Sequence, residues 1–368
     1  MKYPPFCPNP DCDRHLLSHR DTTWYSPSGY YRTHTHGTVK RFRCNSCGFR
    51  FSAQTFSLDY FVKKKLPYRY IFNQLKSAAG IRDIARDLKV SPGAVLNRIS
   101  RMSRQAVGIH CGLCRSVRLN EDLVADGFES FTVSQYYPNN IHLLAGKESQ
   151  YLYAFDYSYL ARKGRMTEYQ KKLNRIKKES SHGGISVTES FSNICSKIDI
   201  LMDRRRGNHT VLYTDQKPQY KRVIAQAHFY SSLSHITISS RLPRTVTNKL
   251  FSVNYLDREI RKDNANHVRE SVQFSRNTGN CMERMALYSL YHNYMKPYRI
   301  RSGTDTVHAE IAGISGKKIN AELKSLFTER RFLSRMKGMS MSDIRTWFGL
   351  YTTPGSTSWR YIPDYAKA

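Results

Sequence analysis

The chain has 368 residues, 40% of them hydrophobic, so it can form two or three folded domains and is not a disordered protein. Its 59 Lys and Arg residues outnumber its 29 Asp and Glu residues, and the formal net charge is +30. This charge favours a polyanionic partner, and nucleic acid is the first candidate. A membrane-binding protein would instead concentrate its basic residues in one amphipathic helix, whereas here they are spread along the whole chain.

The first residues contain no apolar segment like that of a signal peptide, and no apolar run approaches the length of a membrane-spanning helix. We therefore expect a cytoplasmic protein with no membrane partner. In such a protein, eight cysteines are better explained as metal ligands or buried thiols than as disulfides.

Two close cysteine pairs near the N-terminus predict a zinc site. Cys7 and Cys12 lie in CPNPDC, and Cys44 and Cys47 lie in CNSC. Two such turns can aim four thiolates at one tetrahedral metal ion. The segment between them alternates basic, aromatic and β-branched residues, as hairpin strands do, so we expect residues 1–55 to form a Cys₄ zinc ribbon. The alternative is four unrelated thiols.

The segment 80–102 predicts two short helices with a tight connection. Apolar residues recur at helical spacing in its first half and again in its second half. Between them, Ser91 is a good N-cap and Pro92 suits the first turn of the second helix. We therefore expect residues 66–108 to form a helix-turn-helix domain that binds DNA.

Polar residues of the second helix are the candidate DNA contacts. Asn97, Arg101 and Arg104 are expected to point away from the apolar stripe, toward base edges and phosphates in a major groove. Arg98 flanks them, and Ser91 lies at the start of the helix. The alternative is an ordinary helical hairpin with a basic, solvated face.

The region 117–300 predicts a mixed sheet. Three strands are expected within 117–157, followed by an exposed helix or mobile insertion at 161–184 and then a helix. Two more strands follow, with a helix between them. In a five-stranded sheet of order 3-2-1-4-5, the first and fourth strands are parallel neighbours. The expected fold class is therefore a multidomain α+β protein with this sheet flanked by helices.

Acidic residues at two strand ends predict a second metal site. Asp126 follows the apolar run LVA, and Asp215 ends VLYTD, so the two carboxylates should emerge side by side. They would repel each other unless a cation lay between them, and hard oxygen ligands select Mg²⁺ or Mn²⁺. A third ligand is expected from VNYLDREIRKD, where Asp257 and Glu259 lie on opposite faces of one helix, so only one can serve. Asp156, on the third strand, should fall outside the site.

These motifs, taken in order, resemble those of bacterial insertion-sequence transposases that have a ribonuclease-H-like DDE catalytic domain. The resemblance covers residues 1 to about 300. The third acid of that family commonly lies in Asn-x-Ile-Glu-Arg, which NYLDR matches with Asp257 in place of Glu. Downstream, Arg269, Phe274 and Ser275 are similar to the family's Arg, Thr, Phe-Ser stretch.

The resemblance implies a DNA transposase that binds the terminal repeats of its element through its N-terminal domains. Such a protein acts as a homo-oligomer on DNA ends, in the nucleoid of a bacterial cytoplasm. Its structural zinc would be held by the four cysteines, and its Mg²⁺ or Mn²⁺ by Asp126, Asp215 and Asp257, with Glu259 as the alternative third acid. These ions would serve strand cleavage and strand transfer.

Two other functions remain open. One is a DNA-binding regulator on a catalytically inactive transposase scaffold, and the other is a structure-directed nuclease that cuts DNA without joining it. Residues 301–368 form a basic C-terminal tail to which the sequence assigns no role.

Overall fold

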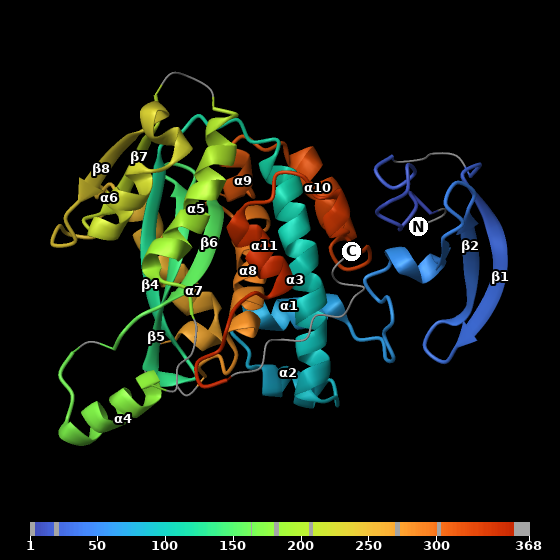
Figure 1. Ribbon diagram of the computed structural model, residues 1–368, viewed down its shortest axis with the longest axis horizontal. Coiled ribbons are helices and arrows are strands. Elements are labelled where there is room, and N and C mark those ends of the chain that lie inside the picture. Colours follow the sequence, from blue (N-terminus) through green and yellow to red (C-terminus); the bar gives the residue numbers. More distant parts are fainter. Residues whose placement is uncertain are drawn as a thin grey trace.

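The computed structural model contains two β-sheets at opposite ends of the molecule (Figure 1). It describes residues 4–17, 22–162, 164–179, 184–205, 209–268, 273–299 and 303–356. The smaller sheet is antiparallel and consists of β1 (Tyr25–Thr33), β2 (Gly37–Cys44) and β3 (Arg50–Ser52). We call the part of the chain from residue 4 to residue 56 the N-terminal module; it holds this sheet and the four-cysteine cluster.

The larger sheet is mixed and has five strands in the order β6-β5-β4-β7-β8. Its strands are β4 (Leu123–Thr132), β5 (Ser134–Gly146), β6 (Leu152–Tyr159), β7 (Val211–Asp215) and β8 (Ser234–Ile238). The strand β4 pairs antiparallel with β5 and parallel with β7. This is the strand order expected from the sequence.

Helices cover both faces of the large sheet. Because side chains alternate along a strand, Leu123 and Ala125 of β4 pack toward α5 and α6, whereas Val124 and Phe128 pack toward α7 and α8. The bounds of these helices are α5 (Val187–Met202), α6 (Pro218–Ala225), α7 (Phe251–Asp263) and α8 (Thr278–Tyr294). The helix α4 (Glu168–Glu179), from the expected insertion, projects away from the body of the molecule (Figure 1).

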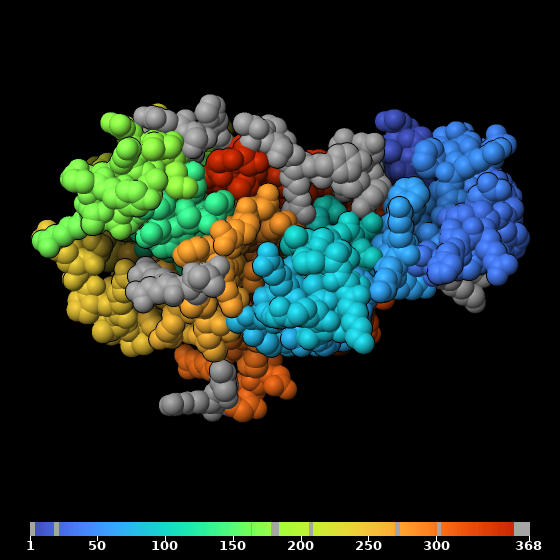
Figure 2. All heavy atoms as spheres, turned by 90° about the horizontal axis from the view of Figure 1, so that it is seen from below, coloured from blue at the N-terminus to red at the C-terminus, as the bar shows by residue number. Residues whose placement is uncertain are grey.

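Three helices connect the two sheets: α1 (Tyr68–Lys76), α2 (Ile81–Asp87) and α3 (Pro92–Cys114). Ser91 caps α3 as expected, since its Oγ accepts a hydrogen bond from the Ala94 amide at 3.3 Å. However, α3 is 23 residues long, and its second half packs against α8 inside the core. In Figure 2, the residues of these helices lie between the N-terminal module and the rest of the molecule.

The C-terminal region folds onto the rest of the chain. Its helices are α9 (His308–Ile311), α10 (Gly316–Ser325) and α11 (Met341–Phe348). After α10 the chain reaches the N-terminal module, where Phe332 contacts Phe6 and Phe56. Short 3-10 helices lie at Ala53–Phe56, His228–Ser232, Ala265–His267 and Leu333–Arg335.

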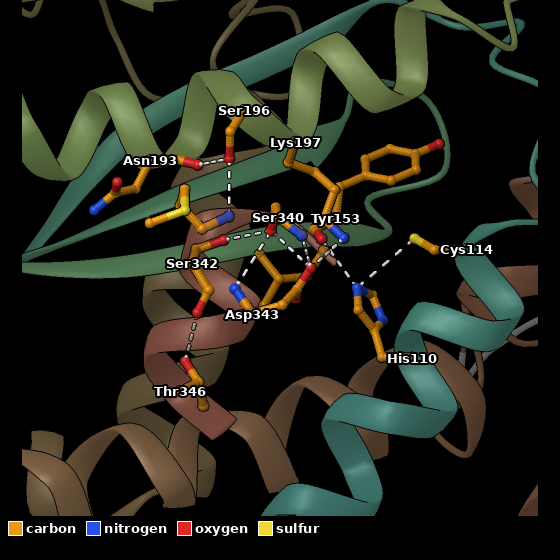
Figure 3. A network of polar contacts seen from close by, with 12 residues as sticks. His110, Cys114, Tyr153, Asn193, Ser196, Lys197, Ser340, Ser342, Asp343 and Thr346 are labelled. Carbon is orange, nitrogen blue, oxygen red and sulfur yellow. Dashed lines mark hydrogen bonds and ion pairs between the residues drawn. The ribbon is translucent and has the colours of Figure 1, made fainter. Parts of the chain in front are cut away.

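A buried ion pair fastens α11 to α5. Lys197 of α5 donates from Nζ to Asp343 Oδ2 of α11 at 2.7 Å, and the Lys197 side chain is only 1% exposed. Figure 3 shows this pair beside Ser340, which caps α11, and beside His110 and Cys114 of α3. Residues far apart in the sequence therefore form one polar network in the core.

Candidate functional site

The four N-terminal cysteines form a cluster with the geometry of a zinc site. Their Sγ atoms all lie within 4.8 Å of one another, with Cys7 and Cys47 separated by 3.6 Å and Cys12 and Cys44 by 3.8 Å. Zinc–sulfur bonds of about 2.3 Å in a tetrahedron place sulfur atoms about 3.8 Å apart. The donor set and the spacing therefore both fit a structural zinc ion.

The electrostatics of the cluster also favour a bound cation. Burial raises the pKa of the Cys7 and Cys12 thiols, although backbone hydrogen bonds oppose this effect. Burial also acts on Cys47, but the hydrogen bond from the Phe49 backbone and neighbouring groups outweigh it and lower the pKa to about 7. A divalent cation would stabilise the thiolate form of all four cysteines.

Asp126 and Asp215 lie side by side, as the sequence predicts, but only Asp215 ends its strand: Asp126 lies within β4, which continues beyond it in antiparallel pairing with β5. In the parallel pairing of β4 and β7, Ala125 lies opposite Thr214, so the next residue of each strand emerges at the same place. Asp126 Oδ1 accepts a hydrogen bond from the Gly127 amide at 2.6 Å. Burial raises the pKa of Asp126, and the charge of Asp215 adds to this effect while Lys217 opposes it.

The side chain of Lys217 lies against both carboxylates. Its Nζ is 3.3 Å from Asp215 Oδ2 and 3.7 Å from Asp126 Oδ1. The backbone there is fixed, because the Lys217 amide donates to Asp215 Oδ1 at 3.2 Å and Pro218 begins α6 directly afterwards. An ammonium group therefore partly offsets the repulsion between the two acids.

Asp257 is the acid of α7 that faces these two carboxylates. Asp126, Asp215 and Asp257 line one open hollow of about 270 Å³. Glu259 does not line it: this residue is buried and pairs with Lys296, which also binds Asp263 at 2.7 Å. The expectation that Asp257 and Glu259 lie on opposite faces is therefore confirmed.

Within the described residues, the four cysteines are the group whose ligand atoms converge closely enough to hold a metal ion. The three carboxylates share a hollow without this convergence. Asp156 lies outside the hollow, as expected, where its Oδ2 accepts a hydrogen bond from Arg345 Nη1 at 2.6 Å.

The candidate DNA contacts of α3 divide into two groups. Asn97 is exposed and Arg104 is half-buried, with its Nη1 donating to Ser100 Oγ at 2.9 Å. Arg98 and Arg101 are each only 6% exposed, so the expectation that Arg101 points toward solvent is wrong.

The reason is the segment 57–66, which lies against α3. Arg101 Nη1 donates to the Leu58 carbonyl at 2.9 Å, and Arg98 donates to the Lys64 carbonyl. Both guanidinium groups also donate to Asn97 Oδ1. These two arginines therefore hold the segment on the helix.

Residues that the sequence did not single out complete the hollow. Lys217, Asn248, Arg244 and Arg261 line it together with the acids. The sequence could have indicated Lys217 as a residue of the hollow, because it lies two residues after Asp215 at the start of a helix. Arg244 belongs to an exposed loop without a local pattern.

The segment after α7 is described only in part. Arg269 lies outside the described residues, and Phe274 contacts Phe131 with ring centroids 5.7 Å apart. The Ser275 carbonyl accepts a hydrogen bond from the Val133 amide at 2.8 Å. These two residues thus pack on the end of β4 and do not line the hollow.

Comparison with protein-family models finds no match to this chain, and comparison with curated proteins finds none either. Among the described residues, no helix combines the length and the apolar character needed to cross a membrane.

Proposed function

We propose that the protein is a metal-dependent DNA transposase. One observation carries the proposal: three carboxylates that arise from β4, β7 and α7 line a single open hollow. Two of them lie on parallel neighbouring strands, Asp126 within β4 and Asp215 at the end of β7, and the third comes from a later helix. A ribonuclease-H-like domain of the DDE type has this arrangement, and the strand order is compatible with that fold.

The hollow has the chemistry needed for Mg²⁺ or Mn²⁺. Its donors are carboxylate oxygens, which these ions prefer, and a cation already lies between two of them in the form of the Lys217 ammonium group. When bound, such an ion would lower the pKa of an attacking hydroxyl or water and neutralise charge on the scissile phosphate. Asp126, Asp215 and Asp257 would hold the ion.

Basic groups around the hollow are suited to DNA phosphates. Arg244 is exposed on the loop between β8 and α7, and Arg261 lies on α7 one turn after Asp257. Guanidinium groups can bind phosphate oxygens in a bidentate manner and so fix the position of a strand. The two arginines would orient the DNA backbone over the carboxylates.

The N-terminal part would supply the recognition of terminal repeats. In this proposal the N-terminal module is a zinc ribbon and the pair α2–α3 is a helix-turn-helix. Ser91, Asn97 and Arg104 are the candidate contacts that retain exposed surface. Two or more copies of the chain would assemble on the two DNA ends.

The test is cleavage and joining of DNA that carries the flanking sequences of the gene, with each acid replaced in turn. Asp126→Asn, Asp215→Asn and Asp257→Asn should each lower strand cleavage at least about a thousandfold, because each removes a charged ligand of the site. DNA binding should remain at the parent level, since the binding modules lie elsewhere in the chain.

Glu259→Gln is the matched control, and it should cut DNA like the parent. If Asp126→Asn and Asp215→Asn cut normally, the catalytic proposal is wrong. Cutting without joining by the parent would instead identify a nuclease.

A second candidate is a DNA-binding regulator on an inactive scaffold. Lys217 favours it, because its ammonium group occupies the position that a catalytic ion would need. This candidate predicts sequence-specific DNA binding by the parent with no cleavage in Mg²⁺ or Mn²⁺.

A further inference from the structure

The ammonium group of Lys217 is a cation of the hollow that approaches both Asp126 and Asp215. Its Nζ lies 3.3 Å from Asp215 and 3.7 Å from Asp126, and its side chain is 34% exposed. A divalent ion bound to both carboxylates at about 2.0–2.1 Å would lie in the same space between them. The ammonium group and the metal ion therefore cannot be bound there together, because they would occupy the same space and because two cations repel each other.

We propose that Lys217 competes with the divalent ion, and that this residue sets the metal affinity of the hollow. The proposal rests on the proposed function for the identity of the metal. Metal binding then requires the ammonium group to leave the two carboxylates, and the apparent affinity is reduced by the cost of that movement.

A buried phenol contacts the same ammonium group that lies against the two carboxylates. Lys217 Nζ is 3.4 Å from the Tyr220 hydroxyl and 5.3 Å from the centre of the Tyr220 ring. The phenol lies one turn further along α6 and is buried. Because the lysine stem is flexible and the backbone is fixed by Asp215 and Pro218, the ammonium group can keep this phenol as a partner when it moves away from the carboxylates.

Replacement of Lys217 should therefore strengthen metal binding in the absence of DNA. In Lys217→Met the two carboxylates keep their repulsion and lose the ammonium group that lies against both of them, so a divalent ion no longer competes with it. We expect the dissociation constant for Mn²⁺ to fall about tenfold, since the exposed side of the lysine is partly screened by water.

The experiment measures free Mn²⁺ by electron paramagnetic resonance during titration of the full-length, zinc-loaded protein. Lys217→Met and Lys217→Gln should both bind Mn²⁺ more tightly than the parent, and Lys217→Arg, which keeps the charge, should resemble the parent. Lys221→Met is the matched control, because Lys221 is an exposed lysine of the same helix. Asp126→Asn combined with Lys217→Met should lose the gain, which assigns the ion to this hollow.

Parent-like Mn²⁺ affinity in both Lys217→Met and Lys217→Gln would overturn the inference. A strand-cleavage assay on the parent separates this result from failure of the proposed function. Cleavage by the parent with unchanged affinity in the variants rejects the role of Lys217 alone. If the variants bind Mn²⁺ more tightly but the parent does not cleave DNA, the proposed transposase function is rejected and the competition between Lys217 and the metal ion is supported.

Discussion

Lys296 neutralises two buried acids on the face of α7 that is turned away from the hollow. It binds Glu259 and Asp263, and its side chain is 5% exposed. Burial on its own would raise the pKa of Glu259, but the hydrogen bond and the charge of Lys296 outweigh it and lower the pKa. Lys296 therefore holds Glu259 charged and also forms an ion pair with Asp263.

We predict that Lys296→Met lowers the free energy of unfolding by roughly 3 kcal/mol, because it leaves two carboxylates buried without their main partner. Urea denaturation measures the loss. Lys262→Met is the control: this lysine also approaches Glu259, but it is 60% exposed and should change the stability by less than about 1 kcal/mol. Equal losses in the two variants would contradict the role assigned to Lys296.

The choice between Asp257 and Glu259 shows what the sequence could predict at this scale. Helical geometry alone indicates that residues two positions apart face opposite sides. It does not indicate which side faces the hollow, because that depends on Lys296, a residue 37 positions after Glu259. The proximity of Asp126 and Asp215 was predictable, because each comes directly after an apolar run of a separate strand, although Asp126 lies within its strand and only Asp215 ends one.

At the scale of single elements, the N-terminal module has a small core, and we expect it to need a bound zinc ion to fold. Its apolar residues form a cluster that is separate from the core of the large sheet. We predict one zinc ion per chain, and loss of that ion in Cys44→Ser should unfold the module, because so little apolar surface cannot stabilise it alone. Metal analysis and limited proteolysis measure the two effects.

The large sheet should survive this change, since its helices form their own core. Near-native far-ultraviolet circular dichroism of Cys44→Ser, with cleavage by protease confined to the module, is the expected result. A zinc content of zero in freshly reduced parent protein would contradict the zinc site.

The helix α3 was predictable at its start and not at its end. Ser91 and Pro92 are local signals, and the structure confirms the cap that they predict. The burial of Arg98 and Arg101 results from contacts with residues 58 and 64, which no periodic pattern within the helix encodes. Helix position therefore predicts the direction of a side chain only when the neighbouring segments are known.

At the scale of the whole molecule, the C-terminal region joins parts that the sequence suggested were independent. It contacts the N-terminal module through Phe332, and it contacts the large sheet through α11. The composition of residues 301–368 gave no sign of this, because the anchoring groups are isolated charged residues. Asp343 and Arg345 each bind a partner that lies 146 or 189 positions away.

The ion pair between Lys197 and Asp343 provides the test of this arrangement. Burial disfavours charge on both residues, yet their mutual attraction raises the pKa of Lys197 and lowers that of Asp343. Lys197→Met leaves Asp343 charged and buried, so we predict a loss of roughly 3–5 kcal/mol in the free energy of unfolding. Because Asp343 also bonds to Ser340 at the start of α11, the amides of this helix should lose protection from hydrogen exchange first.

The double variant Lys197→Met with Asp343→Leu distinguishes an ion pair from simple packing. It removes both charges and fills the space with apolar atoms, so it should recover much of the stability that the single change loses. If the double variant is less stable than Lys197→Met, the contribution of Asp343 comes mainly from capping α11. If Lys197→Met itself costs less than about 1 kcal/mol, the C-terminal helix is not fastened by this pair, and its attachment depends on Arg345 and Asp156 instead.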